Sequence, residues 1–310
     1  MKIVFMGTPK AAVSSLQKII SDGYDVVAVY TQPDRPAGRG NKLFAPPVKE
    51  FALQNNLEVF QPAKIKTAEA LEVFKSHAAD VAVVVAYGRI LPQTFLEAFP
   101  KGAINVHFSL LPKYRGAAPV NWAIVEGEEK TGVTTMQMDA GLDTGDILLQ
   151  KEVEIGNEEN SIELMERLAI IGSDLLSDTL KSLDRLKPIP QKHDEATLAP
   201  IMKKEDGLID WNLRSKEIAD RVRGFQPFPT SFTKYQEKKL TIWKARELQD
   251  SGFNIQSFGE ILEAKGGNLF VSCGKETVLQ IEELQIEGKR RMTVRDFLNG
   301  IKMQIGEKLG

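Results

Sequence analysis

The chain carries the stretch Asn105-Val106-His107-Phe108-Ser109-Leu110-Leu111-Pro112, in which an amide, an imidazole and a hydroxyl side chain lie within five residues. The apolar pair Ala103-Ile104 leads into it, so the pattern predicts a strand that runs into a functional loop. Side chains alternate faces along a strand, which makes Asn105 and His107 point the same way. A neutral donor and a titratable ring at one spot suit the polarisation of a carbonyl group. A lone Asn-x-His pair can also serve only to satisfy backbone groups at the end of a strand.

Strands and helices alternate around this stretch through the first part of the chain. Short apolar runs predict the strands, and segments with one apolar face predict the helices between them. This rhythm implies an α/β fold with a doubly wound, mostly parallel, Rossmann-like sheet, whose ligand crevice lies beyond the carboxyl ends of the strands. The predicted strands are 3–5, 25–30, 57–60, 80–86, 102–106, 132–138 and 145–152, and the predicted helices lie near 12–20, 47–55, 67–77, 119–125 and 161–183.

The second part of the chain follows a different pattern. A polar connector with spaced prolines occupies residues 187–200, and the short strands with glycine punctuation that follow it suggest a small β-barrel. We therefore predict a Rossmann-like domain over 1–188, a linker over 189–207 and a barrel domain over 208–310. The elements expected in that domain are a helix near 216–223, strands at 239–244, 259–264, 268–273 and 278–285, and a last helix near 293–303 that opens with a threonine cap.

Composition limits the class of protein. With 310 residues and 42% apolar content, the chain is long enough for two packed domains, which argues against wholesale disorder. A net charge of −2 neither requires nor excludes a nucleic-acid partner. Cys273 is the single cysteine, which rules out an internal disulfide framework and a thiolate zinc cluster and fits a reducing cytosol. No apolar run suits a signal peptide or approaches the ~18 residues of a membrane span, so we expect a soluble cytoplasmic protein.

Two familiar kinds of site find little support in the sequence. Gly7-Thr8-Pro9 follows the first predicted strand, but the G-x-G-x-x-G spacing is missing, so NAD binding is a weak interpretation, and the chain has no P-loop. The three histidines, His77, His107 and His193, are scattered, and His77 ends a predicted helix, where a cation suits the helix dipole. We expect no metal site.

A second polar cluster, at residues 139–146, joins two predicted strands and contains three aspartates and two glycines. Aspartate and glycine are turn residues, so the cluster can be a plain turn. A sharper interpretation points one carboxylate into the crevice. There an aspartate near His107 would favour the charged imidazole and fix its orientation.

A long insertion at residues 31–47 separates a predicted strand from a helix and holds three cations, Arg35, Arg39 and Lys42, against one anion. Long loops without regular structure are usually functional or mobile. A flexible basic loop beside a crevice could grip phosphates, and a solvated, poorly ordered loop is an equal alternative.

A second basic segment, Lys289-Arg290-Arg291, is predicted to form a turn between a strand and a helix. Together with Lys244 and Arg246 on a barrel face, it could follow a nucleic-acid backbone. Taken alone, such a run is more commonly solvated surface charge.

Several of these segments together resemble folate-dependent formyltransferases. The resemblance rests on the stretch at 105–112, on Arg115-Gly116-Ala117-Ala118-Pro119 and on Gly141-Leu142-Asp143-Thr144-Gly145. Further motifs are similar to those of the formyltransferases that act on methionyl-tRNA: the insertion at 31–40, Val84-Val85-Ala86-Tyr87-Gly88-x-Ile90-Leu91-Pro92, Ile209-Asp210-Trp211, Arg223-x-Phe225-x-Pro227-x-Pro229 and Leu284-Gln285-x-x-Gly288-Lys289-Arg290-x-Met292. The motifs are long and in order, and they cover essentially the whole chain.

This resemblance implies an enzyme that transfers the formyl group of 10-formyltetrahydrofolate to the amine of methionyl initiator tRNA, in support of translation initiation. Asn105 and a protonated His107 would donate hydrogen bonds to the oxyanion, each worth ~3 kcal/mol when pre-positioned. Asp143 would keep His107 charged and relay a proton from the attacking amine to the leaving nitrogen. No covalent enzyme intermediate and no metal is required.

The resemblance also implies binding residues for both substrates and a tRNA-binding, OB-like C-terminal domain. The folate would be held by Ser109, Leu110, Leu111 and Pro112, and its pterin pocket would be lined by Gly88, Arg89, Ile90 and Leu91. The tRNA would be bound electrostatically by Arg35, Arg39, Lys42, Lys289, Arg290 and Arg291. A monomer is expected, because one asymmetric substrate would occupy both domains.

Three residues depart from the family pattern, and two other functions stay open. Phe108 stands where glycine, alanine or proline is common, which bears on the shape of the folate pocket; Phe228 replaces a usual tryptophan, and Leu198 a frequent tyrosine. An enzyme with the same Asn-His-Asp set could formylate a nucleotide-linked amino sugar, although the basic insertion and the later motifs favour tRNA. A non-catalytic folate- or RNA-binding protein is a different class, against which the complete set of three polar groups argues.

Overall fold

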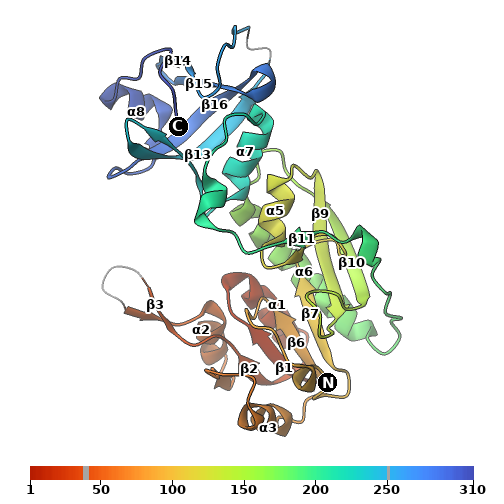
Figure 1. Cartoon of the computed structure of the whole chain (residues 1–310). Helices are drawn as coiled ribbons and strands as arrows, with labels where there is room; N and C mark the ends of the chain where they lie inside the picture. The colour runs from red at the N-terminus through yellow and green to blue at the C-terminus, as the bar shows by residue number, and fades with distance from the viewer. Residues whose placement is uncertain (38–41, 250–251) are drawn as a thin grey trace. The chain divides into compact units, whose positions relative to one another are not determined.

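The computed structural model describes residues 1–37, 42–249 and 252–310 (Figure 1). The chain forms two compact units. The first contains Met1–Pro119, Lys130–Glu154 and Met165–Ala199, and the second contains Val120–Glu129, Ile155–Leu164 and Pro200–Gly310. The second unit thus includes two short segments from within the first part of the sequence. In the described part of the chain, no helix has the length and apolar character needed to cross a membrane.

The first unit is built on a seven-stranded sheet with the strand order β10-β9-β7-β6-β1-β2-β5. The strands from β5 to β7 pair in parallel, and β9 and β10 add an antiparallel edge. The prediction of an α/β fold with a mostly parallel, Rossmann-like sheet is therefore confirmed. The strands are β1 (Lys2–Gly7), β2 (Asp25–Tyr30), β5 (Val59–Phe60), β6 (Val81–Val85), β7 (Ala103–His107), β9 (Lys130–Gln137) and β10 (Ile147–Glu154).

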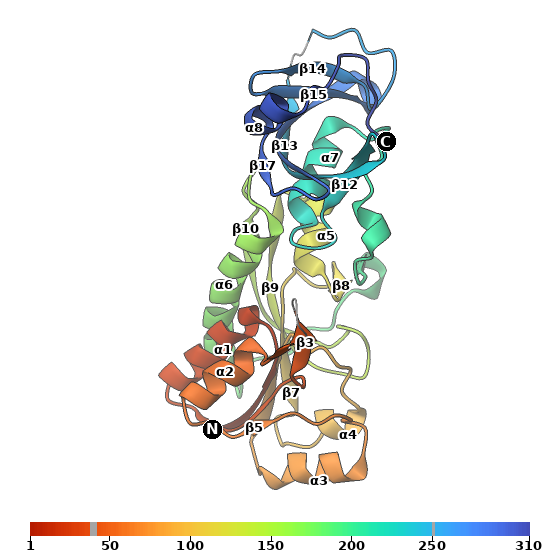
Figure 2. The same cartoon turned by 90° about the vertical axis from the view of Figure 1, so that its left-hand side faces the viewer.

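Helices cover both faces of this sheet (Figure 2). On one face, Phe74 and Phe95 pack in a core with Val84 of β6. On the other face, Gly172 leaves room for the side chain of Val106 on β7. Strand β6 is buried along its whole length, as expected for a central parallel strand that is apolar on both sides. The helices of the first unit are α1 (Lys10–Ser21), α2 (Pro47–Gln54), α3 (Ala68–Ser76), α4 (Gln93–Leu96) and most of α6 (Ser161–Ser182), whereas α5 (Pro119–Val125) belongs almost wholly to the second unit.

Two short strand pairs in the first unit were not predicted. Strands β3 (Arg35–Ala37) and β4 (Lys42–Phe44) pair antiparallel within the insertion at 31–47, so the expectation of a loop without regular structure is wrong for these residues. Strand β8 (Arg115–Gly116) pairs in parallel with β11 (Leu198–Ala199) and ties the connector to the loop after β7. Strands of two or three residues are too short to show the alternation on which sequence prediction depends.

The second unit contains an antiparallel sheet in the order β12-β13-β16-β15-β14, with β17 paired to β16. Of these strands, β12 and β17 were missed by the sequence pattern. Thr293 caps the last helix as predicted, since its hydroxyl accepts a hydrogen bond from the Asp296 N–H (3.2 Å). The elements are α7 (Ser215–Gly224), β12 (Ser231–Tyr235), β13 (Lys238–Leu248), β14 (Ile261–Lys265), β15 (Asn268–Cys273), β16 (Thr277–Ile286), β17 (Met292–Thr293) and α8 (Val294–Gly300).

One face of the second sheet carries the core of this unit, which includes Trp211, Ile242, Leu284 and Phe297. The C-terminal residues connect the two ends of the sheet. The N–H of Leu309 donates to the Gly259 carbonyl (2.8 Å), just before β14, and the N–H of Gly310 donates to the Lys234 carbonyl (3.0 Å) on β12. A separate β-rich unit is thus present, whereas the OB-like barrel stays a prediction.

Candidate functional site

Strand β7 carries the two polar side chains of the opening stretch. Asn105 is 8% exposed and His107 is 5% exposed, so both are buried at the carboxyl end of a strand whose other residues are buried too. Asn105 pairs with Val84 of β6 and therefore lies on the face of the sheet that carries the α3 and α4 core. Since neighbouring residues alternate faces, His107 lies on the same face and Val106 and Phe108 on the other.

Both ring nitrogens of His107 face oxygen atoms. Nε2 lies 2.9 Å from the Tyr114 carbonyl oxygen, which can only accept, so Nε2 carries a proton. Nδ1 lies 3.7 Å from Oδ2 of Asp143, which is too far for a direct hydrogen bond and close enough for an ion pair. A proton on Nδ1 would make the ring a cation beside a carboxylate. In the charged ring, the N–H that is left for a ligand is the one on Nδ1.

Asp143 is held in an uncommon backbone conformation, with φ of +53°. Left-handed φ values are rare outside glycine, although aspartate tolerates them better than most residues. The N–H of Gly116 donates to Oδ2 of Asp143 (2.8 Å), the same oxygen that faces His107. A turn from Asp139 precedes it, in which the carboxylate accepts from the Thr144 hydroxyl (2.6 Å). The Gly116 N–H thus holds the Asp143 carboxylate, and the Asp139–Thr144 bond closes the turn around this residue.

The side-chain amide of Asn105 has no hydrogen-bond partner within the described ranges 1–37, 42–249 and 252–310. A buried amide normally finds partners, because leaving it unpaired costs free energy. An amide that is free beside His107 is therefore available to a ligand. Asn105 lies two residues before His107 on the same face of β7, and His107 faces Asp143 at 3.7 Å.

The loop predicted to hold the folate is shaped by internal hydrogen bonds. The Ser109 hydroxyl is fully buried and donates to the Lys113 carbonyl (2.6 Å). Thr134 of β9 donates to the Ser109 carbonyl (2.7 Å) and accepts from the Leu111 N–H (3.1 Å). The Leu111–Pro112 peptide bond is cis. Because the Ser109 hydroxyl is bonded within the loop and the Leu111 side chain is buried, a ligand here would meet Pro112, Leu110 and main-chain groups.

The segment predicted to line the pterin pocket follows β6. Gly88 has a φ of +83°, which suits glycine. The guanidinium of Arg89 donates to the Gln32 side chain (3.1 Å) and to the Pro62 carbonyl (2.8 Å), so it is tied to the protein. Ile90 is 69% exposed, whereas Leu91 is buried. Ile90 is thus the side chain of this segment that offers an apolar surface to a ligand.

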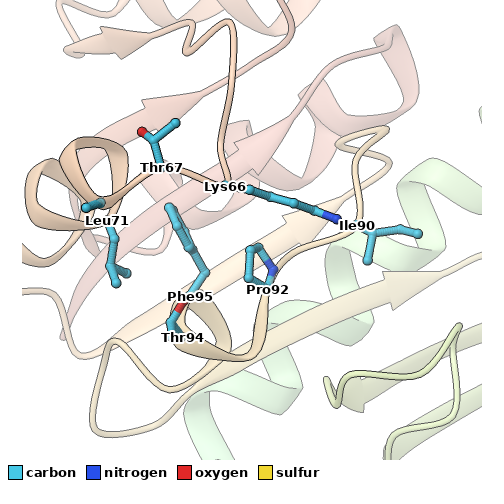
Figure 3. Close-up of a pocket in the computed structure, with 8 residues that line it drawn as sticks. Lys66, Thr67, Leu71, Ile90, Pro92, Thr94 and Phe95 are labelled. Atoms are coloured by element: carbon cyan, nitrogen blue, oxygen red, sulfur yellow. The ribbon is translucent and has the colours of Figure 1, made fainter.

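A cavity of about 320 Å³ lies beside Ile90 (Figure 3). A second cavity of about 430 Å³ shares Lys66, Thr67 and Ile90 with it, and Lys64 and Arg89 add positive charge there. In Figure 3 the side chain of Lys66 extends toward Ile90. The first cavity is lined by Lys66, Thr67, Ala68, Leu71, Ile90, Pro92, Thr94 and Phe95.

The predicted tRNA contacts are divided between the two units. In the first unit, Arg35 and Lys42 belong to the β3–β4 pair, and Arg39 lies outside the described residues. In the second unit, Lys289, Arg290 and Arg291 are exposed before β17, as predicted for a basic turn. Arg291 pairs with Glu283 (2.5 Å) and lies over the Trp243 ring (5.1 Å).

Phe108 faces away from the site. A Cβ atom added to Gly172 of α6 would lie 3.4 Å from the ring of Phe108 and 3.2 Å from Val106, so the ring occupies the core beneath α6. Helix α6 therefore packs directly on this ring at Gly172. The departure from the family pattern at residue 108 is therefore absorbed in the core on the far face of the sheet.

Sequence reasoning missed three groups that contact the Asn-His-Asp set. The Tyr114 carbonyl fixes His107, the Gly116 N–H holds the Asp143 carboxylate, and Gln191 donates to the Asp143 carbonyl (3.0 Å). Two of these are main-chain groups, which no side-chain pattern reveals. Gln191 lies in the proline-spaced connector, where a single glutamine gave no signal. Within the described residues, no group of three or more His, Cys, Asp or Glu side chains is arranged to hold a metal ion.

Comparison with known proteins matches two family models to the chain. The model described as formyl transferase matches residues 1–180, and the model described as formyl transferase, C-terminal domain matches residues 201–302. A methionyl-tRNA formyltransferase from Acetivibrio thermocellus is 47% identical over 312 residues, and the match covers 100% of both chains. Another from Koribacter versatilis is 50% identical over 313 residues, covering 100% of this chain and 99% of its own.

Solved structures with the same fold have lower sequence identity. An N-formyltransferase from Helicobacter canadensis in complex with folinic acid and dTDP-3-aminofucose gives a TM-score of 0.68 at 20% identity, covering 91% of this chain and 98% of its own. A methionyl-tRNA formyltransferase from Clostridium thermocellum gives a TM-score of 0.56 at 21% identity, covering 83% and 97%. At such identities the likeness shows the fold alone.

Proposed function

The chain belongs to the formyl transferase family, and on that premise we propose that it transfers the formyl group of 10-formyltetrahydrofolate to the amino group of methionyl initiator tRNA. Members of this family use formyl-tetrahydrofolate. The observation that carries the proposal is the convergence of a free Asn105 amide, His107 Nδ1 and Asp143 at the end of β7. Full-length relatives named for methionyl-tRNA support the choice of acceptor.

The reaction exchanges one carbon–nitrogen bond for another. The neutral methionyl amine attacks the formyl carbon, and the bond from that carbon to N10 of the folate breaks. Negative charge gathers on the formyl oxygen as the new bond forms. Asn105 Nδ2 and the N–H on His107 Nδ1 donate to that oxygen, and their Cα atoms are roughly 6.6 Å apart along the strand.

Asp143 accounts for the remaining proton. The methionyl amine loses a proton as it attacks, and N10 of the folate must gain a proton as it leaves. Transfer of one proton from the amine to N10 therefore balances the reaction. The Asp143 carboxylate lies 3.7 Å from His107 and its side chain is 15% exposed, which suits a group that accepts a proton and returns it through water.

The folate lies against the segment after β6. Arg89 is committed to Gln32 and Pro62, so Gly88 and Arg89 contribute main-chain groups to the pterin. Ile90 offers its exposed apolar side chain at the mouth of the cavity beside Pro92. Leu110 and Pro112, at the loop after β7, complete the contact surface.

The tRNA is bound through basic side chains. Arg35, Arg39 and Lys42 contact it from the insertion, and the turn at Lys289–Arg291 contacts it from the second unit. Local clusters of this kind allow a chain with a net charge of −2 to bind a polyanion. The enzyme works as a cytoplasmic monomer. Sedimentation or light scattering of the purified chain tests whether it is monomeric.

Formylation of charged tRNA is the direct test. Methionyl initiator tRNA is incubated with the protein and 10-formyltetrahydrofolate, and the aminoacyl-tRNA is resolved on acid–urea gels. We expect a mobility shift that requires the folate and that is absent when the methionyl amine is acetylated beforehand. No shift with an active folate donor and a free amine would remove the proposed function.

A nucleotide-linked amino sugar is the alternative acceptor. Solved sugar N-formyltransferases share the fold with this chain at TM-scores of 0.67 and 0.68, with 20% identity. The same assay with a dTDP-linked amino sugar in place of tRNA separates the two acceptors. We expect no formylated sugar, and turnover of the sugar above that of tRNA would reverse the assignment. Folate binding without transfer to either acceptor would instead indicate a non-catalytic protein.

A further inference from the structure

Gln191 is a buried glutamine that makes four hydrogen bonds through its side chain. It lies in the connector after α6 and is 6% exposed. Its Nε2 donates to the carbonyl oxygens of Asp143 (3.0 Å) and Gly145 (2.6 Å). Its Oε1 accepts from Nε (3.1 Å) and Nη2 (2.7 Å) of Arg115. The amide thus uses its full capacity of two donors and one oxygen with two acceptor sites.

Chemistry fixes the orientation of this amide. Main-chain carbonyls can only accept and a guanidinium can only donate, so the nitrogen must face Asp143 and Gly145 and the oxygen must face Arg115. Arg115 is itself buried, at 7% exposed, and its side chain also lies 3.3 Å from Nδ1 of His193. A flipped amide would place donors against donors, which makes Gln191 a rigid link.

The connector around Gln191 is anchored on both sides. Before it, Ile189 exchanges two main-chain hydrogen bonds with Ile147, each of 2.8 Å. After it, Ala199 of β11 pairs with Gly116 of β8. The position of the glutamine is therefore set by the sheet and by the loop after β7, and it does not depend on the turn that it holds.

The backbone conformation of Asp143 requires support from neighbouring groups. Its φ of +53° is rarely adopted by residues other than glycine and persists where neighbouring groups determine it. Gly145, two residues later, packs so closely against the end of β9 that only glycine fits, since a Cβ there would lie 1.8 Å from the Gln137 carbonyl. Gln191 bonds the main chain of both residues, and the Gly116 N–H bonds the carboxylate. Together they set the distance from Asp143 to His107.

We infer that Gln191, oriented by Arg115, is a positioning residue that holds the Asp143 carboxylate opposite His107 for proton transfer. This inference rests on the proposed function. Gln191 touches no substrate, and it acts through the main chain of Asp143. Its loss should therefore lower kcat through Asp143 and leave the binding of both substrates intact.

The test compares Gln191→Met with a matched control, Gln226→Met. Gln226 is also buried, at 7% exposed, and its amide donates to the carbonyls of Val222 (3.2 Å) and Trp243 (2.9 Å) in the second unit. Both substitutions remove two bonds to carbonyl oxygens and keep the side-chain length. We expect Gln191→Met to lower kcat for tRNA formylation about 10- to 100-fold with little change in either KM, and Gln226→Met to leave kcat within about twofold of the wild type.

The decisive measurement repeats the substitution in an Asp143→Ala background, with single-turnover formylation by excess enzyme. If Gln191 acts through Asp143, adding Gln191→Met to Asp143→Ala changes the rate less than about twofold. The same loss in both backgrounds, or wild-type kcat in Gln191→Met, overturns the inference while the proposed function stands. Absence of formylation by the wild type and by Gln226→Met would remove the proposed function itself.

A second variant covers the case in which Gln191→Met does not fold. Gln191→Glu keeps an oxygen for Arg115 and loses both donors to the turn, and its extra carboxylate oxygen repels the carbonyls of Asp143 and Gly145. Thermal unfolding near the wild-type temperature with a kcat loss of the same order as Gln191→Met supports the inference. Wild-type kcat in folded Gln191→Glu contradicts the inference, because the donors from Gln191 to Asp143 and Gly145 would then be unnecessary for turnover.

Discussion

The end of β7 and the outer surface of the second sheet use polar side chains in opposite ways. Around β7, Asn105 and His107 are less than 10% exposed, and Asp143 is fixed by a main-chain N–H. On the second sheet, the side chain of Arg291 is 46% exposed and that of Arg246 is 60% exposed, and their partners are carboxylates at the surface. The function expected of the β7 region depends on the fixed positions of its side chains, and that of the second sheet depends on its positive charge.

This difference predicts which experimental variable each region responds to. Buried, fixed donors stabilise a developing charge strongly because water is excluded, and ionic strength changes their effect little. Exposed cations attract a polyanion over a distance, and salt screens them within about 10 Å at 0.1 M. Substitutions near β7 should therefore change kcat, and substitutions on the second sheet should change the salt-dependent affinity for tRNA.

The largest effect is expected from the site at the end of β7. In the proposed mechanism His107→Ala removes a donor to the formyl oxygen and the ring that faces Asp143, so kcat should fall about 10³-fold or more, and Asn105→Ala should cost about 10²- to 10³-fold. Acid–urea gels under single-turnover conditions measure the rate. Filter binding of tRNA to His107→Ala should match the wild type. A variant that keeps its turnover, or loses tRNA affinity in proportion, would end the division between geometry and charge.

A smaller effect is expected on the second sheet. Lys289 and Arg290 are exposed in the turn before β17, and the double substitution Lys289→Ala/Arg290→Ala should raise the KM for tRNA about tenfold and leave kcat unchanged. The slope of log affinity against log salt concentration should become shallower by about 2.

A matched control for this pair is Lys265→Ala, which removes an exposed cation of the same unit outside the predicted set. Its KM for tRNA should stay near the wild-type value. Equal shifts for the control and for the turn residues would mean that overall charge, and no particular turn, attracts the tRNA.

A third effect, smaller again, concerns a buried polar pair in the first unit. The Tyr30 hydroxyl and His77 Nε2 lie 2.9 Å apart, and burial lowers the pKa of His77 below its usual 6.5, against a smaller raising effect of Glu58. The unfolded chain therefore takes up a proton near pH 6.5 and the folded ring only at lower pH, so the free energy of unfolding falls as pH drops through that window.

The measurement is thermal unfolding between pH 7.5 and 5.5 for the wild type and His77→Gln. The wild type should lose more stability than the variant, by less than about 1 kcal/mol, because the ring is partly exposed and solvent reduces the shift. Parallel curves would show that His77 titrates alike in both states.

The sequence was sufficient for the parts of the molecule that local periodicity determines. Alternation along 103–107 predicts that Asn105 and His107 share a face, and the apolar run at 80–86 predicts a central strand, as β6 shows. The cluster at 139–146 predicts a carboxylate near His107, and Asp143 lies 3.7 Å from that ring. In each case the pattern spans only a few consecutive residues.

What the sequence could not predict depends on contacts between distant segments. Gln191 is 48 residues from Asp143, and one glutamine in a polar connector has no periodic partner. Strands β3, β4 and β8 are two or three residues long, so their hydrogen bonds and not their pattern define them. The partners of His107 and of the Asp143 carboxylate at Tyr114 and Gly116 are main-chain groups, which any residue type supplies.

The smallest effect is expected at Cys273. Labelling of its thiol reports whether the buried inner face of the second sheet, opposite the charged outer surface, opens in the native protein. The thiol is fully buried on β15, and burial raises its pKa from 9.0 to about 12. At a given pH below 9 the thiolate fraction is then about 10³-fold lower than in an ordinary thiol, so reaction with a disulfide reagent at pH 8 should be undetectable in the native protein. One equivalent should react after denaturation, and the reagent should leave tRNA formylation unchanged. Rapid labelling of the native protein would mean that the second sheet opens readily. Binding of tRNA to its surface would then require the sheet to become ordered, in addition to electrostatic attraction.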